Sequence, residues 1–290
     1  MDLNERATVV SALNQLGYAT SAAHPEPMEN YNRGNAYKSL GFAERRFVQH
    51  FKNTSQLAER YFKSDASVYA NLIEWYEAAC AQSAEPVFSY LLTIQNHGDW
   101  NSNPDSWDEV HARTDYGEEN DSAVNEYLTC IRYSDMAWKE LVDYFSAVER
   151  PVIICMVGDH SPSFANAICD PALTESGEHR LLLRSTPYIL WSNSIDLSGV
   201  QGGTVSLNYL APMLMQAAGL PLTPYYQKMM EMREDIPVIT SYGTYVADGA
   251  EHTAGENESR DAAVRDYLYL AYNNMMEKSQ NVAREWFFYS

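Results

Sequence analysis

The apolar residues of this chain fall into short unbroken runs and longer helical repeats. Three runs have the length and composition of buried strands: 87–94, 152–157 and 186–192. Helical spacing of apolar residues marks further segments: 4–16, 65–82, 122–148, 206–218 and 261–278. A strand, a long helix and a second strand follow one another over 87–157, which is the order of a right-handed βαβ crossover. The pattern therefore predicts an α/β fold around a central, mostly parallel sheet.

Two of the predicted strands end in side chains that can do chemistry. His97 follows the first strand, and Asp159 and His160 follow the second. Because the carboxyl ends of parallel strands meet at one edge of a sheet, we expect these side chains to lie near one another. Gly158 is expected to let the chain turn sharply before the pair. Asp159 and His160 suit a divalent metal or an acid/base pair, and a capping Asp beside a hydrogen-bonded His is the alternative. The polar residues 101–120 are expected to form a loop or lid over this edge.

An earlier loop also gathers candidate binding residues. Two prolines placed two positions apart make the chain irregular after a short strand-like stretch at 18–22. The loop carries four side chains of interest: His24, Glu26, Tyr31 and Arg33. Arg33 presents a planar set of donors and, with Tyr31, suits a phosphate group. A solvated loop with a salt bridge is the alternative.

Charge and composition narrow the classes of partner. The 290 residues carry 20 Lys and Arg against 39 Asp and Glu, a formal net charge of −19. The negative electrostatic potential of such a chain opposes binding to nucleic acid or to an anionic membrane. An anionic substrate would need a metal ion or local Arg and His side chains to offset this potential. Apolar residues make up 46%, enough for one large core, and no apolar run approaches the ~18 residues of a membrane span. We expect one α/β domain over 1–247, followed over 248–290 by a polar linker (248–260) and a C-terminal helix packed on the same domain.

Three motifs occur in a characteristic order: H-x(6)-Y-N-R from His24 to Arg33, N-H-G at 96–98 and G-D-H-x-P-S at 158–163. The stretches 185–193 and 206–226 extend this order over nearly the whole chain. The set resembles the sulfatase-type catalytic domain of lipoteichoic acid synthases and related phosphoglycerol transferases, in the alkaline phosphatase superfamily. The resemblance implies a three-layer αβα sandwich.

The resemblance also implies roles for particular side chains. Asp159 and His160 correspond to metal ligands of the family, with Mn²⁺ or Mg²⁺ as the ion. His97 corresponds to the active-site histidine that contacts the phosphate or the leaving oxygen. The residues that correspond to the loop holding the glycerophosphate group are His24, Glu26, Tyr31 and Arg33. The implied reaction is metal-dependent transfer of phosphoglycerol from a lipid head group to a cell-envelope polymer or glycan.

The family's domain begins with a strand that carries an acidic metal ligand, followed by a nucleophilic Thr at a helix N-terminus. Thr8 and Thr20 are the early threonines here, and neither follows a buried strand in such a context. We therefore expect an N-terminally truncated domain, its C-terminal two-thirds, soluble and inactive by itself. The complete protein is expected to be membrane-anchored with an extracellular-facing domain. The alternatives are a non-catalytic module for anionic glycerophosphate or glycan, and a phosphate or sulfate ester hydrolase of the same superfamily.

Overall fold

The helices and strands of the chain follow the predicted order for most of its length. The structure is a computed structural model and describes residues 6–58, 60–100, 107–168, 181–200, 202–276 and 284–289. Its strands are β1 (Ala19–Ala23), β2 (Glu44–Arg46), β3 (Val87–Leu91), β4 (Ile153–Val157), β5 (Tyr188–Ser192), β6 (Val238–Ile239), β7 (Tyr245–Ala247) and β8 (Ala250–His252). Its helices are α1 (Val9–Gln15), α2 (Arg33–Ser39), α3 (Asp65–Gln82), α4 (Glu118–Ser146), α5 (Ala165–Ile168), α7 (Leu210–Ala217), α8 (Pro224–Asp235), α9 (Glu258–Met276) and α10 (Arg284–Phe287). Some predicted segments include residues outside the described ranges: 4–5, 101–106 and 277–278.

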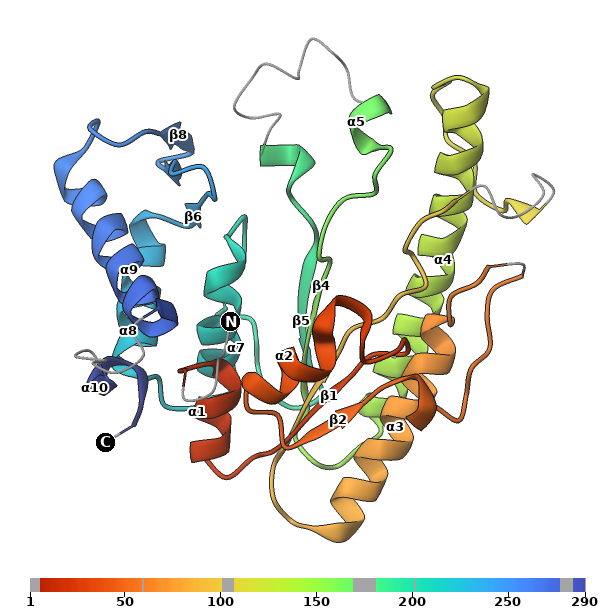
Figure 1. Ribbon diagram of the computed structural model, residues 1–290, viewed down its shortest axis with the longest axis horizontal. Coiled ribbons are helices and arrows are strands. Elements are labelled where there is room, and N and C mark those ends of the chain that lie inside the picture. Colours follow the sequence, from red (N-terminus) through yellow and green to blue (C-terminus); the bar gives the residue numbers. More distant parts are fainter. Residues whose placement is uncertain are drawn as a thin grey trace.

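A parallel sheet in the order β2-β1-β3 carries helices on both faces. Successive side chains of β1 point to opposite faces, as in any strand. Ala22 belongs to a buried cluster with Val10 of α1 and Tyr37 of α2. Ala23, its neighbour, packs on the other face with Val68 of α3. This arrangement of helix, sheet and helix confirms the predicted α/β fold (Figure 1).

The strand β4 departs from the predicted crossover. β3, α4 and β4 follow one another in the chain, but β4 pairs with β5, and the pairing is antiparallel. Within the described ranges β3 is hydrogen-bonded to β1 and β4 to β5, so each keeps one unpaired edge. The prediction that β3 and β4 share one hydrogen-bonded parallel sheet is therefore wrong for these residues.

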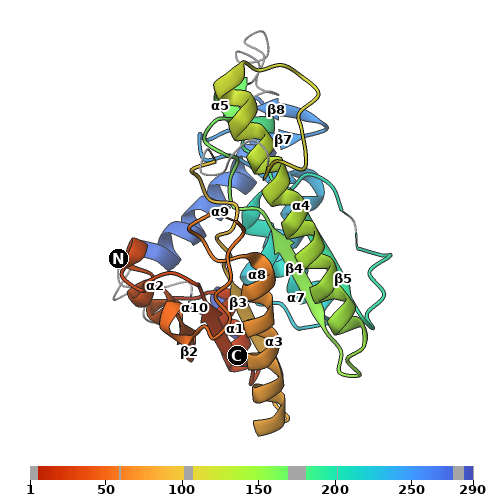
Figure 2. The same ribbon diagram turned by 90° about the vertical axis from the view of Figure 1, so that its right-hand side faces the viewer.

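A side chain at the end of β5 adds a link between this strand and the end of α4. The Nδ2 group of Asn193 donates to the carbonyls of Phe145, Val148 and Arg150, at distances of 2.8–3.1 Å. Its Oδ1 atom accepts from the N–H of Val152 at 2.8 Å. Asn193 thus binds the end of β5 to the turn between α4 and β4, and α4 lies along the β4–β5 pair (Figures 1 and 2).

The C-terminal part adds a helical cluster and a small antiparallel sheet. α7, α8 and α9 pack with β6 and β7 around the buried rings of Tyr209 and Tyr245. The predicted linker over 248–260 is wrong in part, because Asp248 and Gly249 form the tight turn between β7 and β8. None of the helices in the described ranges combines the length and the apolar character that a membrane crossing requires.

Candidate functional site

Asp159 and His160 lie directly after β4 and present two donor atoms to one region of solvent. The Nδ1–H of His160 donates to the Ser161 carbonyl at 2.9 Å, which leaves the lone pair on Nε2. Oδ1 of Asp159 accepts from the backbone N–H of His160 at 2.9 Å, and Oδ2 lies 3.6 Å from Nε2 of His160. Both side chains are largely exposed, at 69% for Asp159 and 71% for His160. An imidazole nitrogen and a carboxylate oxygen can therefore reach the same ligand.

Gly158 is required by close packing, not by a left-handed backbone. It is not among the residues with positive φ, so the chain leaves β4 without a left-handed glycine. A Cβ atom at this position would lie 3.0 Å from Cβ of Thr186, just before β5. The Thr186 hydroxyl donates to the Gly158 carbonyl at 2.7 Å, and the Gly158 N–H donates to the Pro187 carbonyl at 3.0 Å. The start of β5 therefore fixes the backbone from which Asp159 and His160 project.

His97 lies in the loop after β3, with one ring nitrogen available. Its Nδ1–H donates to the Gly98 carbonyl at 2.9 Å, so Nε2 carries the lone pair. The ring meets that of Phe62 edge to face, with 5.2 Å between the ring centres. The side chain is exposed, which suits a group that exchanges a proton with a ligand.

A buried ion pair holds the backbone of this loop. Nη1 of Arg60 lies 2.6 Å from Oε1 of Glu126 on α4, and both side chains are only 2% exposed. Arg60 also donates to the carbonyls of His97, at 2.5 Å, and Asp99, at 3.0 Å. Sequence reasoning missed both partners, because they are 66 positions apart and lie in unremarkable polar surroundings. The pair positions His97 through its backbone.

A second buried network ties the same loop to α3 and α4. Oε1 of Gln95 accepts from the N–H of Asp65, and Nε2 of Gln95 donates to the Cys130 carbonyl and the Ser134 hydroxyl. Ser134 in turn donates to the carboxylate of Asp65 at 2.6 Å. Burial raises the pKa of Asp65. The loop that carries His97 is thus anchored to two helices.

His24, at the end of β1, is fully buried and neutral. Its Nδ1–H donates to the Leu92 carbonyl at 2.9 Å, and Nε2 has no hydrogen-bond partner among the described residues. Burial lowers the pKa of His24 to about 4; the bond to Leu92 opposes this shift, and the positive charge of Arg33 adds to it. At neutral pH Nε2 is therefore a hydrogen-bond acceptor enclosed inside the protein.

The remaining residues of the 24–34 loop differ in exposure. Tyr31 is 82% exposed and has a left-handed backbone with φ of 54°. The Arg33 guanidinium stacks on its ring, 4.8 Å from the ring centre, at the start of α2. Glu26 lies inside the protein, at 6% exposure.

Tyr90 of β3 connects this loop with the end of β4. Its pKa is raised by burial and by the negative charge of Asp159, and is lowered by the positive charge of Arg33. Its ring packs on those of Tyr37 and Phe42, with 5.9 and 6.0 Å between ring centres. Sequence reasoning missed Tyr90, although the alternation of β3 places it on the face that carries the loop.

The charges of Arg33 and Asp159 both act on Tyr90, and that of Arg33 also acts on His24, while His97 contacts Phe62 and Arg60. The donor types of Asp159 and His160, a hard oxygen and an imidazole nitrogen, fit Mn²⁺, Mg²⁺ or Zn²⁺. The number of donors does not complete such a site: within the described ranges no group of three His, Cys, Asp or Glu side chains is placed to hold a metal ion. The residues present fit two coordination positions of a divalent ion.

Comparison with known proteins agrees with this fold and site. A family model for sulfatases matches residues 2–220, and the chain belongs to the sulfatase family. Among curated relatives, the "Putative cyclic beta-1,2-glucan modification protein" of Rhizobium meliloti is 25% identical over 286 residues, which cover 92% of this chain and 42% of that protein. The chain therefore spans less than half the length of this relative.

Two solved structures share the fold. The phosphoglycerol transferase GacH of Streptococcus pyogenes, in complex with sn-glycerol-1-phosphate, superposes with a TM-score of 0.71 at 20% identity, covering 94% of this chain and 65% of that one. A protein of the alkaline phosphatase superfamily from Vibrio parahaemolyticus superposes with a TM-score of 0.63 at 14% identity, covering 100% of this chain and 71% of that one. The fold is that of the alkaline phosphatase superfamily, as the sequence motifs indicated.

Proposed function

We propose that this chain is part of a metal-dependent phosphoglycerol transferase, which moves phosphoglycerol from a lipid head group to a cell-envelope polymer or glycan. The observation that carries the proposal is the donor pair after β4, where Nε2 of His160 and Oδ2 of Asp159 lie 3.6 Å apart. The charges of Asp159 and of the cation Arg33 also both act on the Tyr90 hydroxyl. A phosphate between them would meet a guanidinium on one side and a metal position on the other. The similarity to a transferase bound to sn-glycerol-1-phosphate supports this choice of substrate. The complete protein would act at the outer face of the cell membrane.

Each of the gathered side chains has a role in the proposed reaction. Arg33, stacked on Tyr31, binds phosphoryl oxygens with its planar donors. His24 stays neutral because burial lowers its pKa, and it supports the end of β1 through its bond to the Leu92 carbonyl; its buried Nε2 would reach a glycerol hydroxyl only once that atom becomes accessible. Nε2 of His97 moves a proton at the leaving oxygen. A divalent ion, when bound, stabilises the negative charge that develops on the phosphoryl group.

The proposed reaction also needs a further metal ligand and a nucleophile, beyond the side chains assigned above. Among the described residues β3 and β4 each keep an unpaired edge, and Tyr90 and Val157 on them are 41% and 40% exposed. A further strand between these edges would cover both side chains and satisfy both edges. It would end beside Asp159, where the resemblance expects an acidic ligand followed by a Thr.

A non-catalytic binding module is the second candidate for the chain by itself. The observation that favours it is the two-ligand set at Asp159 and His160, since structural and catalytic sites use three or four protein ligands. Under this alternative the chain binds glycerophosphate through Arg33 but shows no turnover with any divalent metal. Hydrolysis of phosphate or sulfate esters differs from transfer only in the acceptor, and product analysis with the complete protein separates the two.

Replacing Arg33 with Gln is expected to weaken the binding of sn-glycerol-1-phosphate roughly tenfold or more, because hydrogen bonds to charged groups contribute about 1.5–3 kcal/mol. Isothermal titration calorimetry at low ionic strength measures the affinity. Lys38→Gln is the matched control, since it removes the same charge from an exposed position of the same helix. An equal loss in both variants would mean that net charge alone governs binding, and would count against the Arg33 site.

A further inference from the structure

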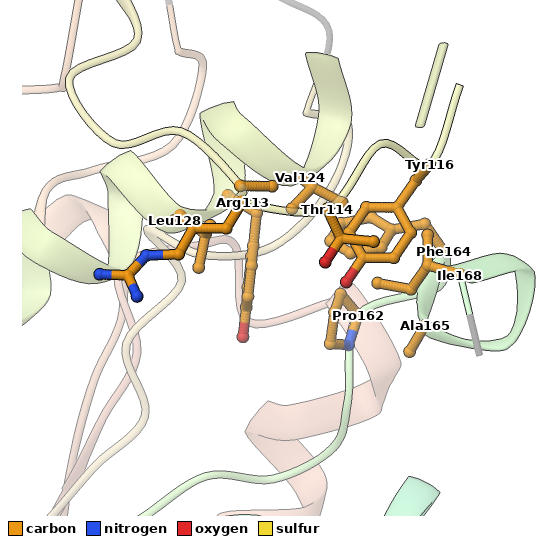
Figure 3. Close-up of a pocket in the computed structure, with 11 residues that line it drawn as sticks. Arg113, Thr114, Tyr116, Val124, Leu128, Pro162, Phe164, Ala165 and Ile168 are labelled. Atoms are coloured by element: carbon orange, nitrogen blue, oxygen red, sulfur yellow. The ribbon is translucent and has the colours of Figure 1, made fainter. Parts of the chain in front are cut away.

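A cavity of about 450 Å³ lies beside the Gly158-Asp159-His160 motif and contains none of the side chains assigned above. Its walls come from α4, from the loop before α4 and from the segment that follows His160 (Figure 3). Pro162 and Phe164 of that segment line it, only two and four residues beyond His160. The volume falls within the range of roughly 300–1,000 Å³ for ligand sites, which leaves room for about one or two sugar rings.

The apolar part of the lining is a preorganised aromatic surface. Tyr127 and Phe164 meet edge to face with 5.5 Å between ring centres, and both contact the ring of Trp100, at 5.6 and 5.0 Å. Trp100 is only 8% exposed, so it holds both rings in place from behind. Val124 and Leu128 flank Tyr127 on the same face of α4. Rigid rings at low entropic cost are a good surface for the C–H face of a sugar.

The polar part of the lining consists mainly of hydroxyl groups. The side chains of Thr114 and Tyr116 turn their oxygens toward the same space above Pro162 (Figure 3). Arg113, the cation of the lining, directs its guanidinium away from these two hydroxyls (Figure 3). Hydroxyls that both donate and accept match a ligand whose edge carries hydroxyls of its own.

The wall that carries these hydroxyls is fastened to α4. Asn125 accepts from the N–H of Ala112 at 2.7 Å, and Asp121 accepts from the N–H of Tyr116 at 2.8 Å. The buried hydroxyl of Thr129 accepts from the N–H groups of Glu109 and Val110, at 3.1 and 3.2 Å. Polar residues of α4 thus hold the loop against the helix, and the cavity is formed before a ligand arrives.

The charges around the cavity favour a neutral ligand. Asp115, Glu118 and Asp121 lie on the adjoining loop and the first turn of α4, in a chain with a net charge of −19. An anionic head group would be repelled there, and an acyl chain would leave the Thr114 and Tyr116 hydroxyls unpaired. A ligand with an apolar face and an uncharged hydroxyl edge satisfies both parts of the lining.

We infer that this cavity binds a hexopyranose ring of a neutral glycan, and that this ring belongs to the acceptor of the transfer. The first half of the inference stands on the cavity itself, and the second half rests on the proposed function. Pro162 of the cavity wall is two residues along the chain from His160, and this short connection is the reason to link the bound sugar with the transfer. The sugar ring stacks on one of the two nearly perpendicular rings of Tyr127 and Phe164 and packs its edge on the other. It shares hydrogen bonds with Thr114 and Tyr116.

Saturation-transfer difference NMR with neutral tetrasaccharides (cellotetraose, maltotetraose and chitotetraose) tests the inference on the chain as it exists. At least one sugar is expected to receive saturation from the wild-type protein. Ala165→Phe, which fills the cavity, is expected to abolish the transfer. Tyr116→Phe is expected to weaken binding roughly three- to tenfold, as the loss of one neutral hydrogen bond. Tyr133→Phe is the matched control, because it removes a hydroxyl from α4 that bonds to Glu109 instead of lining the cavity.

Three results would overturn the inference. The first is no saturation transfer to any of the sugars, and the second is equal saturation transfer in all variants. The third is saturation transfer to the acyl chains of dihexanoyl phosphatidylglycerol in the wild type that is lost in Ala165→Phe. Circular dichroism verifies that each variant folds. If Ala165→Phe does not fold, Tyr116→Phe still tests the inference. Sugar binding must persist in Arg33→Gln, which lacks the phosphate site. If the protein binds the sugar but does not bind glycerol phosphate, the proposed function alone is refuted. If it binds glycerol phosphate but not the sugar, this inference alone is refuted.

Discussion

Glu126→Gln is expected to destabilise the protein by about 3–5 kcal/mol, since it leaves the Arg60 guanidinium charged and buried without its counter-ion. Both side chains are 2% exposed, so water cannot replace the lost carboxylate. The loop of His97 should loosen at the same time, because Arg60 also holds the carbonyls of His97 and Asp99. Urea unfolding followed by circular dichroism measures the change, and amide exchange at His97 reports the loosening.

Asp143→Asn supplies the control for this prediction. Asp143 pairs with Lys139 on the same helix, but their side chains are 60% and 73% exposed. Loss of this pair is expected to cost less than about 1 kcal/mol. Similar losses for both variants would show that the Arg60–Glu126 pair contributes no more than a surface pair, against the role assigned to it here.

Acid is expected to destabilise the protein through His24, because each unit of difference between its folded and unfolded pKa is equivalent to about 1.4 kcal/mol. The total loss of stability from this residue is expected to reach about 3 kcal/mol. The pKa of His24 is about 4 in the folded protein, against an ordinary value of 6.5. Between these values the unfolded chain binds a proton that the folded protein does not, so stability falls as the pH falls from about 6.5 to about 4. Above this window the ring is neutral in both states and contributes no pH dependence.

His24→Asn isolates this contribution from that of the many carboxylates. The amide N–H of Asn can still donate to the Leu92 carbonyl, but the side chain does not titrate. The free energy of unfolding is measured at pH 7 and at pH 4.5. The decrease between these two pH values is expected to be about 2–3 kcal/mol smaller in His24→Asn than in the wild type. Parallel pH profiles would contradict a buried neutral His24.

The elements that the sequence predicts well are those in which local pattern and tertiary structure agree. α3 spans Asp65–Gln82, as its apolar spacing indicated. Asp159, His160 and His97 all follow strands, because an apolar run ending in Gly or polar residues has few other structures open to it. The metal, substrate and catalytic roles of these residues stay predictions.

Other features depend on contacts that a linear pattern does not contain. The pairing of β4 with β5 is a long-range backbone contact, and the Asn193 bonds that link its end to α4 are marked by no period in the sequence. The sequence does indicate the β7–β8 hairpin, since Asp248-Gly249 suits a two-residue turn with positive φ at both positions. The acidic composition of 248–260 favoured a linker instead. Arg60 and Tyr90 act through partners far along the chain, which only the folded structure reveals.

The central claim is that Asp159 and His160 are two ligands of a divalent metal ion, and titration with Mn²⁺ tests it directly. Electron paramagnetic resonance of free Mn²⁺ measures binding to the wild type, to Asp159→Ala and to the control Asp143→Ala. Weak but saturable binding is expected in the wild type and in Asp143→Ala, since two protein ligands make a poor site. Asp159→Ala is expected to bind at least about tenfold more weakly. Equal binding by Asp159→Ala and the wild type would contradict the assignment of a metal position to the end of β4.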